Sequence, residues 1–333
     1  MKKYLIRFLK FAIPVAIIAW LLASLNQEDL DRLRQQEKDW PMLACGAALV
    51  LATVCATISR WYLLVRALDL KFRVADAFRL GFLGFLLNFV GVGSVGGDLF
   101  KAFFIAREQP GRRAEAVATV AMDRVVGLFA LLLVTSTAIL VTGVADADWK
   151  VRAICEFTLV VTAVAIAFVV LMLVPRFRRG RMVHAITRIP KIGPTLERLI
   201  AAVGVYREKR LVLASTVGMS VFVHVSLPVA IYLAAIAIFD QPPTMAEHLI
   251  LVPLAMCAGA LPLTPAGLGT FELAVSELYK LLPVQPNDDG IIVALVYRLM
   301  TVLVAVVGAV YYWSSRREVS EILEEAEREQ EEQ

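Results

Sequence analysis

The chain has 333 residues, of which 59% are apolar and 19% are charged, and its formal net charge is +4. Soluble globular domains are about half apolar and one quarter charged, so this composition excludes an ordinary soluble fold and indicates partial solvation by lipid. The basic residues are scattered among short loops, which argues against nucleic acid as a partner. Strand alternation is not evident, so helices rather than a barrel are expected to satisfy the backbone.

Apolar segments follow one another along the chain, and six of them approach or exceed the roughly 20 residues that cross a bilayer. The predicted spans are 8–25, 41–65, 118–143, 153–174, 211–239 and 291–313. The first span is preceded by a basic start, as in a signal peptide, but no small-residue cleavage site follows its apolar run. We therefore expect this span to be retained. Two further segments, 78–106 and 249–282, are interrupted by glycine and proline.

The distribution of Lys and Arg predicts how these segments cross, because short cytoplasmic loops are enriched in both residues. Both ends of segment 78–106 are basic, whereas both ends of segment 249–282 are acidic. A segment with both ends on one side of the membrane is expected to form a re-entrant helical hairpin. We therefore predict an all-α, multi-pass helical bundle of six spans and two opposed hairpins, with both termini in the cytoplasm.

The two hairpins share a spacing between an acidic and a basic residue. The interval from Asp98 to Arg124 equals the interval from Glu272 to Arg298. A single shift in numbering, 272 − 98 or equally 298 − 124, therefore superposes the two pairs. Charge topology and residue spacing thus agree on two inverted repeats, which is a design found in membrane transporters.

The predicted spans and the shift between the two repeats indicate a single membrane domain followed by a tail. The predicted boundaries are 1–315 for the membrane domain, about 1–145 and 150–315 for its inverted halves, and 316–333 for the acidic cytoplasmic tail.

Glycine and proline interrupt both hairpins and free backbone groups that would cost several kcal/mol each in lipid. The predicted break residues are Gly93, Gly96, Gly97, Pro265, Gly267 and Gly269. Each break leaves a helix N-terminus inside the membrane, where N–H groups and the helix dipole favour an anion such as a lipid phosphate. Thr264 and Thr270 can cap this helix or add hydrogen-bond donors.

Charged side chains inside a membrane cost about 2.5–3.5 kcal/mol each on insertion scales, so they are expected to pair. Two interpretations of the acid–arginine pairs stay open. The pairs could pin the hairpins, or the arginines could meet a lipid phosphate while the acids respond to protonation or bind a cationic headgroup. Lys101 could likewise meet phosphate or snorkel to the interface. The candidate substrate-binding residues are Asp98, Arg124, Glu272, Arg298, Lys101 and Thr264.

Other polar residues receive structural interpretations. Arg60 is expected in a basic loop, Trp61 at a span end as an interfacial anchor, and Asp123 near the cytoplasmic interface. His248 is expected at the interface, and His224 to be hydrogen-bonded packing within a span. The histidines and cysteines show no metal-binding spacing, so neither a metal nor another cofactor is expected.

Three runs of residues resemble the transmembrane domain of the lysylphosphatidylglycerol synthase/flippase family, and the resemblance covers roughly 8–315. The runs are Gly-Gly-Asp-Leu-Phe-Lys at 96–101, Asp-Arg-Val-Val-Gly-Leu at 123–128, and Leu-Pro-Leu-Thr-Pro-Ala-Gly-Leu-Gly-Thr-Phe-Glu at 261–272. The matching positions are Gly97, Asp98, Arg124, Pro265, Gly267, Gly269, Glu272 and Arg298. The resemblance implies a flippase-like fold that moves phospholipids or polyprenyl-linked lipids between leaflets of the cell (inner) membrane, and it implies a homodimer as one arrangement.

Bifunctional members of the family carry a soluble C-terminal aminoacyl-transferase domain. This chain ends shortly after its last predicted span, so we expect no lysyl-lipid synthesis and no enzyme activity. It has no Gly-x-x-x-x-Gly-Lys-Ser/Thr phosphate loop, so lipid movement through a groove between the halves would be independent of ATP. The alternatives are a non-transporting accessory protein that binds lipid or a partner, and a membrane enzyme acting on a lipid headgroup.

Overall fold

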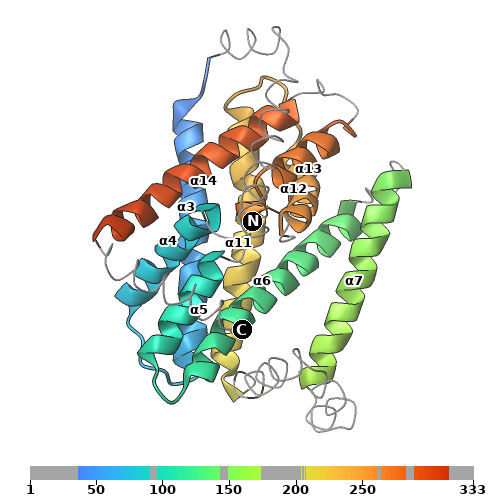
Figure 1. The fold of residues 1–333 in the computed structure, drawn as a ribbon. Coiled ribbons are helices and arrows are strands. Elements are labelled where there is room, and N and C mark those ends of the chain that lie inside the picture. The colour runs from blue at the N-terminus through green and yellow to red at the C-terminus, as the bar shows by residue number, and fades with distance from the viewer. Residues whose placement is uncertain are drawn as a thin grey trace, which may run out of the picture. The chain divides into compact units, whose positions relative to one another are not determined.

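The computed structural model describes residues 37–90, 96–142, 149–173, 204, 206, 208–260, 264–282 and 289–314. All regular structure in these ranges is helical (Figure 1). Among the described residues, five helices are long and apolar enough to cross a membrane, and they correspond to five of the six predicted spans. These helices are α3 (Trp40–Ala67), α6 (Arg113–Thr142), α7 (Trp149–Leu173), α11 (Arg210–Ile236) and α14 (Asp289–Ser314). The predicted span 8–25 lies outside the described residues.

The two interrupted segments each contain two short helices. These are α4 (Val74–Val90) and α5 (Gly96–Glu108) in the first segment, and α12 (Met245–Ala260) and α13 (Thr270–Tyr279) in the second. Even α4, with 17 residues, extends only about 26 Å at 1.5 Å per residue, which is shorter than the roughly 30 Å hydrocarbon core of a bilayer. The division into short helices agrees with two hairpins, whose re-entrant topology stays a prediction.

The described residues fall into two compact units. Unit 1 takes its residues from 1–55, 82–99 and 223–316, and unit 2 takes its residues from 56–81, 100–222 and 317–333. Several helices, among them α3 and α11, contribute to both units. The inverted halves predicted at about 1–145 and 150–315 stay a prediction.

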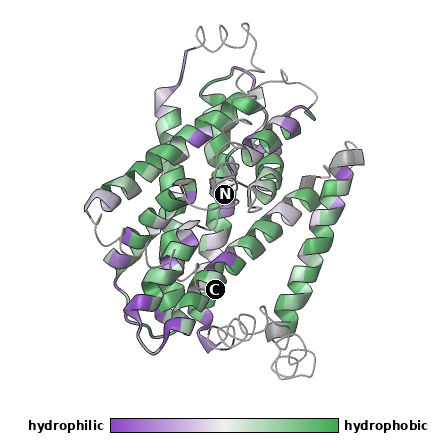
Figure 2. Cartoon of the chain, in the orientation of Figure 1, coloured by the Kyte–Doolittle hydropathy of each residue, from purple (hydrophilic) through white to green (hydrophobic). Residues whose placement is uncertain are grey.

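Unit 1 is built around the second pair of short helices. α13 packs against α12 on one side and α14 on the other, and Figure 1 shows α12 and α13 next to each other. Apolar side chains such as Leu254, Val275 and Val293 are buried among them. α14 also exposes apolar side chains, with Leu299 59% and Val310 66% exposed. Figure 2 shows this helix mostly in green, the colour of hydrophobic residues. Soluble proteins rarely expose such a face, so it is suited to contact with lipid.

Unit 2 contains a pair of long helices, α6 and α7, that pack against each other. A hydrogen bond of 2.7 Å from Ser136 Oγ to Thr162 Oγ1 joins them in a buried position. The opposite face of α7 is apolar and open, since Phe157 is 70% exposed and Val164 is 64% exposed. Figure 2 shows the apolar character of α7 along its length. Unit 2 therefore also presents a face that lipid can solvate.

The first pair of short helices makes a close backbone approach at Gly97. The N–H of Gly97 donates a hydrogen bond of 2.9 Å to Asn88 Oδ1, which connects the first turn of α5 to α4. A Cβ atom at Gly97 would lie 1.9 Å from the carbonyl oxygen of Gly84. Only glycine fits between the two helices at this position.

Gly97→Ala should therefore lower the thermal unfolding midpoint of the detergent-solubilised protein by at least about 3 °C, because overpacking against rigid backbone costs about 1–3 kcal/mol. Gly218→Ala is the matched control, since a Cβ there meets nothing within 4 Å. Its midpoint should stay unchanged or rise slightly through better helix propensity. Equal midpoints for the two variants would contradict the close approach.

Candidate functional site

The break between α12 and α13 is a tight turn with an unusual backbone. Its described residues, from 264 onward, contain a short 3₁₀ helix, η2 (Pro265–Gly267), and three residues with positive φ: Ala266 at 49°, Gly267 at 66° and Gly269 at 82°. A Cβ at Gly267 would lie 2.9 Å from the carbonyl oxygen of Gly259, so the end of α12 packs directly on this turn. The glycines predicted as break residues provide both the positive φ and the close packing.

Glu272 lies in the first turn of α13 and is fully buried, with 0% of its surface exposed. Its Oε2 accepts a hydrogen bond of 2.8 Å from the N–H of Gly269 at the helix N-cap. Its Oε1 accepts a hydrogen bond of 2.5 Å from Nε of Arg298 on α14. The carboxylate is thus held by an opposite charge and by the positive end of a helix, and both interactions offset its burial.

Arg298 also satisfies the backbone of the turn. Its two terminal nitrogens donate hydrogen bonds to the carbonyl oxygens of Ala266, at 3.3 Å, and Gly267, at 3.5 Å. A guanidinium has five N–H donors, so three of them are used by Glu272 and the turn. The side chain is nearly buried, with 12% of its surface exposed. One arginine therefore neutralises a buried acid and occupies carbonyl groups that the helix break has freed.

The two threonine hydroxyls of the turn bond to each other and to its backbone. Thr264 Oγ1 lies 3.4 Å from Thr270 Oγ1, and Thr270 Oγ1 donates a hydrogen bond of 3.1 Å to the carbonyl oxygen of Gly267. Thr264 is buried. The structure thus brings Thr264, Glu272 and Arg298 together around one turn.

The candidate residues of the first hairpin are less fully defined. Asp98 lies in the first turn of α5 and Arg124 lies on α6, both half-buried, and their pairing stays a prediction. Gly96 is the first residue of α5, and Gly93 lies outside the described residues. The Nζ atom of Lys101 lies 5.3 Å from the centre of the Trp61 ring, which is a cation–π distance.

The structure contradicts the predicted loop position of Arg60 and shows that it pairs with a buried Asp123. α3 continues to Ala67, so Arg60 lies inside the helix rather than in a loop, and both side chains are buried. Arg60 Nε donates a hydrogen bond of 2.7 Å to Asp123 Oδ1 on α6. A second bond of 2.9 Å runs from its terminal nitrogen to Ser220 Oγ on α11. This ion pair and the bond to Ser220 join three helices within unit 2. Asp123 is thus buried within the protein, and its depth in the membrane stays a prediction.

Two signals in the sequence could have indicated this pair. Residues 47–67 contain neither glycine nor proline, so the helical pattern runs through Arg60 without a break. Gly127 follows Asp123 by one helical turn, and a Cβ there would lie 3.2 Å from the Arg60 guanidinium. A small residue one turn from a buried acid leaves room for a large cation against the helix.

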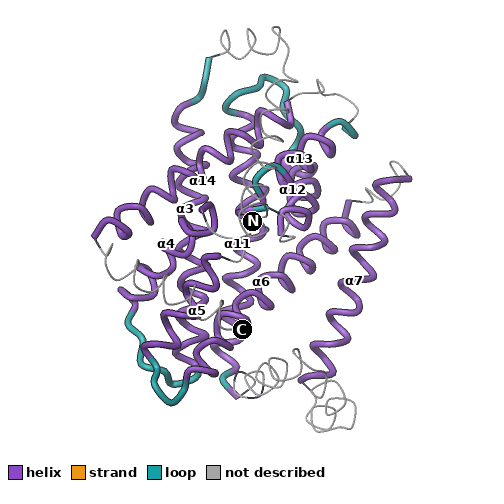
Figure 3. Tube along the Cα trace, in the orientation of Figure 1, coloured by secondary structure: helices purple, strands orange, loops and turns teal. Residues whose placement is uncertain are grey.

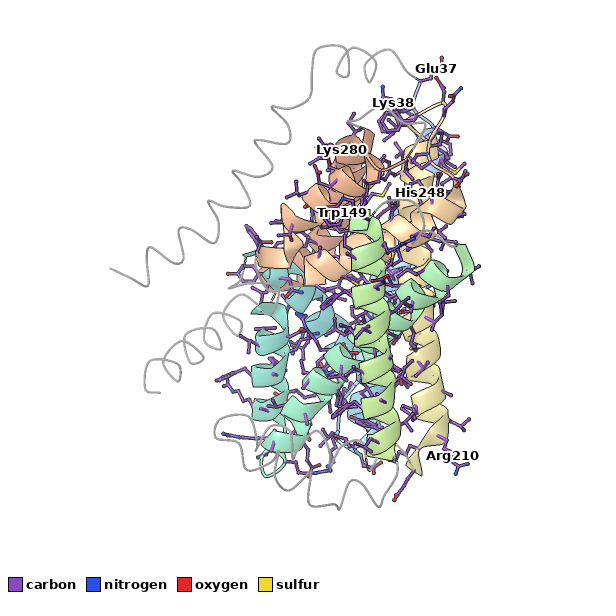
Figure 4. The ribbon with its side chains drawn as sticks, turned by 90° about the vertical axis from the view of Figure 1, so that its right-hand side faces the viewer. Glu37, Lys38, Trp149, Arg210, His248 and Lys280 are labelled. Carbon is purple, nitrogen blue, oxygen red and sulfur yellow. The ribbon has the colours of Figure 1, made fainter. Side chains whose placement is uncertain are left out.

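Trp61 is not the exposed interfacial anchor that its position predicts, and His248 is buried within the protein. Trp61 is 1% exposed, and its indole N–H donates a hydrogen bond of 3.3 Å to Thr119 Oγ1. His248 is fully buried on α12, where Figure 4 labels it, and its Nε2 lies 2.6 Å from the hydroxyl of Tyr279 on α13. Within the described part of the chain, no group of three His, Cys, Asp or Glu side chains could hold a metal ion.

Comparison with known proteins identifies one family. A family model described as "Lysylphosphatidylglycerol synthase TM region" matches residues 7–308, which is most of the chain. No curated protein matches the sequence.

Glu272→Gln should lower the thermal unfolding midpoint in detergent by several degrees, because it leaves the buried guanidinium of Arg298 uncompensated, at a cost of about 3 kcal/mol. Glu277→Gln is the matched control on the same helix, since Glu277 is exposed and pairs with Lys280 at the surface. Its midpoint should change by less than about 1 °C, as is typical of surface ion pairs. A drop of the same size in both variants would rule out a special role for the buried pair.

Asp123→Asn should also lower the thermal unfolding midpoint. The expected loss of unfolding free energy is about 3–5 kcal/mol, because Arg60 would stay charged and buried. The exposed Glu115→Gln on the same helix should have little effect. The double change Arg60→Met with Asp123→Leu should recover most of the loss, because it removes both buried charges. A double variant as unstable as Asp123→Asn would show that packing, not charge pairing, determines the loss.

Proposed function

We propose that this chain, which belongs to the family of lysylphosphatidylglycerol synthase transmembrane regions, moves a lipid between the two leaflets of a membrane. Its family and its five apolar helices make it a membrane protein related to lipids. One observation carries the proposal: the buried Glu272–Arg298 pair lies at a helix break within an apolar bundle. Ionisable groups at membrane depth are candidate functional groups because their burial is costly.

The chemistry of this site suits a phosphate-bearing headgroup. Arg298 donates to two backbone carbonyls at 3.3 and 3.5 Å, which are long hydrogen bonds for a guanidinium. A lipid phosphate would be a stronger acceptor for the same donors, because both partners would be charged. In our proposal the headgroup exchanges with these carbonyls while Glu272 keeps the guanidinium in place. The substrate is a phospholipid or a polyprenyl-linked lipid.

The order of helix lengths supports the predicted inverted repeat. Long, short, short and long helices follow one another from α3 to α6, and again from α11 to α14. In our proposal the lipid moves between two inverted halves, and the hairpins enter from opposite sides. The membrane is the cell (inner) membrane, with both termini in the cytoplasm.

The proposed movement uses neither ATP nor an enzymatic step. An ion gradient, the membrane potential or the lipid gradient would drive it, and the protein would act as a transporter with membrane lipid as its substrate. A homodimer is compatible with this activity and is part of the same proposal.

A second candidate function is an accessory protein that binds lipid or a partner without moving lipid across. The hydrogen bonds of the turn favour it, because both oxygens of Glu272 and three donors of Arg298 are already satisfied within the protein. Such a cluster can pin a hairpin without any ligand. A transport measurement on purified protein separates the two candidates.

Purified protein in liposomes should make fluorescent phospholipids of the inner leaflet accessible to a membrane-impermeant quencher, above the level of protein-free liposomes. Arg298→Lys should reduce the initial rate by about tenfold, because lysine keeps the charge but loses the planar fork that binds phosphate in two places. Glu277→Gln, exposed on α13, should transport at the wild-type rate.

Two outcomes would count against parts of this proposal. If no lipid in a panel of headgroups crosses with the wild-type protein, transport is refuted and the accessory function is favoured. If Arg298→Lys transports at the wild-type rate while remaining folded, the site is refuted and transport stands.

A further inference from the structure

Several helix ends of unit 2 meet at one end of the unit and form a basic surface. α3 ends there, α4 begins, α5 ends, and α6 and α11 begin. Figure 3 shows the loop between α3 and α4 and the loop between α5 and α6 at this same end. We call residues 66–76, 107–115 and 208–210 the basic platform.

Side-chain bonds fix the three ranges of the basic platform to one another. The bonds are Gln109 Nε2 to the carbonyl oxygen of Lys71 (2.7 Å), Arg112 to the carbonyl oxygen of Leu68 (2.9 Å), and Lys209 Nζ to Asp69 Oδ1 (2.9 Å). The hydrogen bond and charge of Lys209 lower the pKa of the Asp69 carboxyl. The buried Tyr206 also donates a bond of 3.0 Å to the carbonyl oxygen of Leu64 near the end of α3. The platform is therefore a connected surface rather than a set of independent loops.

The basic platform has an excess of positive charge. Its ranges contain eight Lys and Arg residues and five Asp and Glu residues. Two of the acids are already paired within the platform, Asp69 with Lys209 and Glu115 with Arg112. Exposed cations without an ion pair to another described residue are Lys71, Arg73, Arg113 and Arg210. Glu108 and Glu208 are also exposed, so the platform carries a net positive charge of three, eight basic minus five acidic residues.

The position of this charge indicates its partner. Three of the helices that end at the platform, α3, α6 and α11, are apolar and long enough to cross a membrane, so their ends reach the depth of lipid headgroups. Figure 4 shows Arg210 at this end of unit 2 and Trp149 at the opposite end. Clusters of four to eight Lys and Arg residues next to membrane-crossing helices are typical of binding sites for anionic lipid.

We propose that the basic platform binds the headgroups of anionic phospholipids in the leaflet that it faces. This binding is separate from lipid movement, because it uses residues outside the turn that holds Glu272 and Arg298. An acidic protein segment would also be attracted to the platform, but a partner at the ends of apolar helices has to share that depth with headgroups. Lipid is already present there at high concentration.

The test compares lipid binding by the wild-type protein and two triple variants in neutral detergent. The platform variant is Lys71→Gln, Arg73→Gln and Arg113→Gln, and the control with the same charge change is Lys38→Gln, Arg152→Gln and Lys280→Gln. Short-chain phosphatidylglycerol should raise the wild-type unfolding midpoint by about 3 °C more than short-chain phosphatidylcholine does. The control should keep this difference, the platform variant should lose more than half of it, and a salt concentration about three times physiological ionic strength should weaken it.

Native mass spectrometry counts bound phosphatidylglycerol directly, so it gives an answer even if the platform variant is less stable. Equal occupancy in the platform variant and the control would overturn the proposal, as would equal shifts with the two lipids in the wild type. A shift produced by inorganic phosphate or by a poly-glutamate peptide, but not by phosphatidylglycerol, would assign the platform to another anion and also overturn it. None of these measurements requires transport, so failure of the lipid-movement proposal would leave this result interpretable.

Discussion

The second hairpin depends on the guanidinium of Arg298, which pairs with a buried acid and also donates hydrogen bonds to the backbone of the turn. A helix that breaks inside an apolar bundle leaves carbonyl groups without partners, and an acid in the same place leaves a charge without solvent. Arg298 meets both needs, because its Nε bonds Glu272 while its other nitrogens reach the carbonyls of Ala266 and Gly267. The break can therefore exist only where α14 lies beside it, which explains why α13 packs against α14.

Unit 2 uses an arginine in a similar way, although Arg60 lies within the continuous helix α3. Arg60 joins α3 to Asp123 on α6 and to Ser220 on α11, and Gly127 leaves room for its guanidinium. Apolar packing between helices is weakly directional in lipid, since lipid tails are as apolar as leucine. A buried charge with defined partners therefore fixes which helices meet and at what depth. Such a centre is therefore found among the described residues of each unit.

Hydropathy predicted the described long helices well, because a membrane requires a fixed length of apolar sequence. Predicted span 41–65 corresponds to α3 at Trp40–Ala67, for example. Glycine and proline likewise indicated the turn between α12 and α13. The burial of Arg60 and His248 could not be predicted from hydropathy. Hydropathy indicates only how far a residue lies from the end of a predicted span. Whether a polar side chain at that depth faces water or a partner depends on the neighbouring helix, which a single sequence does not specify.

The bond between His248 and Tyr279 has a consequence for the hydrogen atoms of this pair. His248 Nδ1 lies 3.0 Å from the carbonyl oxygen of Thr244, which can only accept, so Nδ1 carries the hydrogen of the neutral ring. Nε2 then accepts from the Tyr279 hydroxyl. A second proton on the ring would turn Nε2 into a donor and force the tyrosine hydrogen to find another acceptor. The hydrogen bond therefore has one direction, from the Tyr279 hydroxyl to His248 Nε2. It connects α12 and α13 in this direction only while the imidazole is neutral.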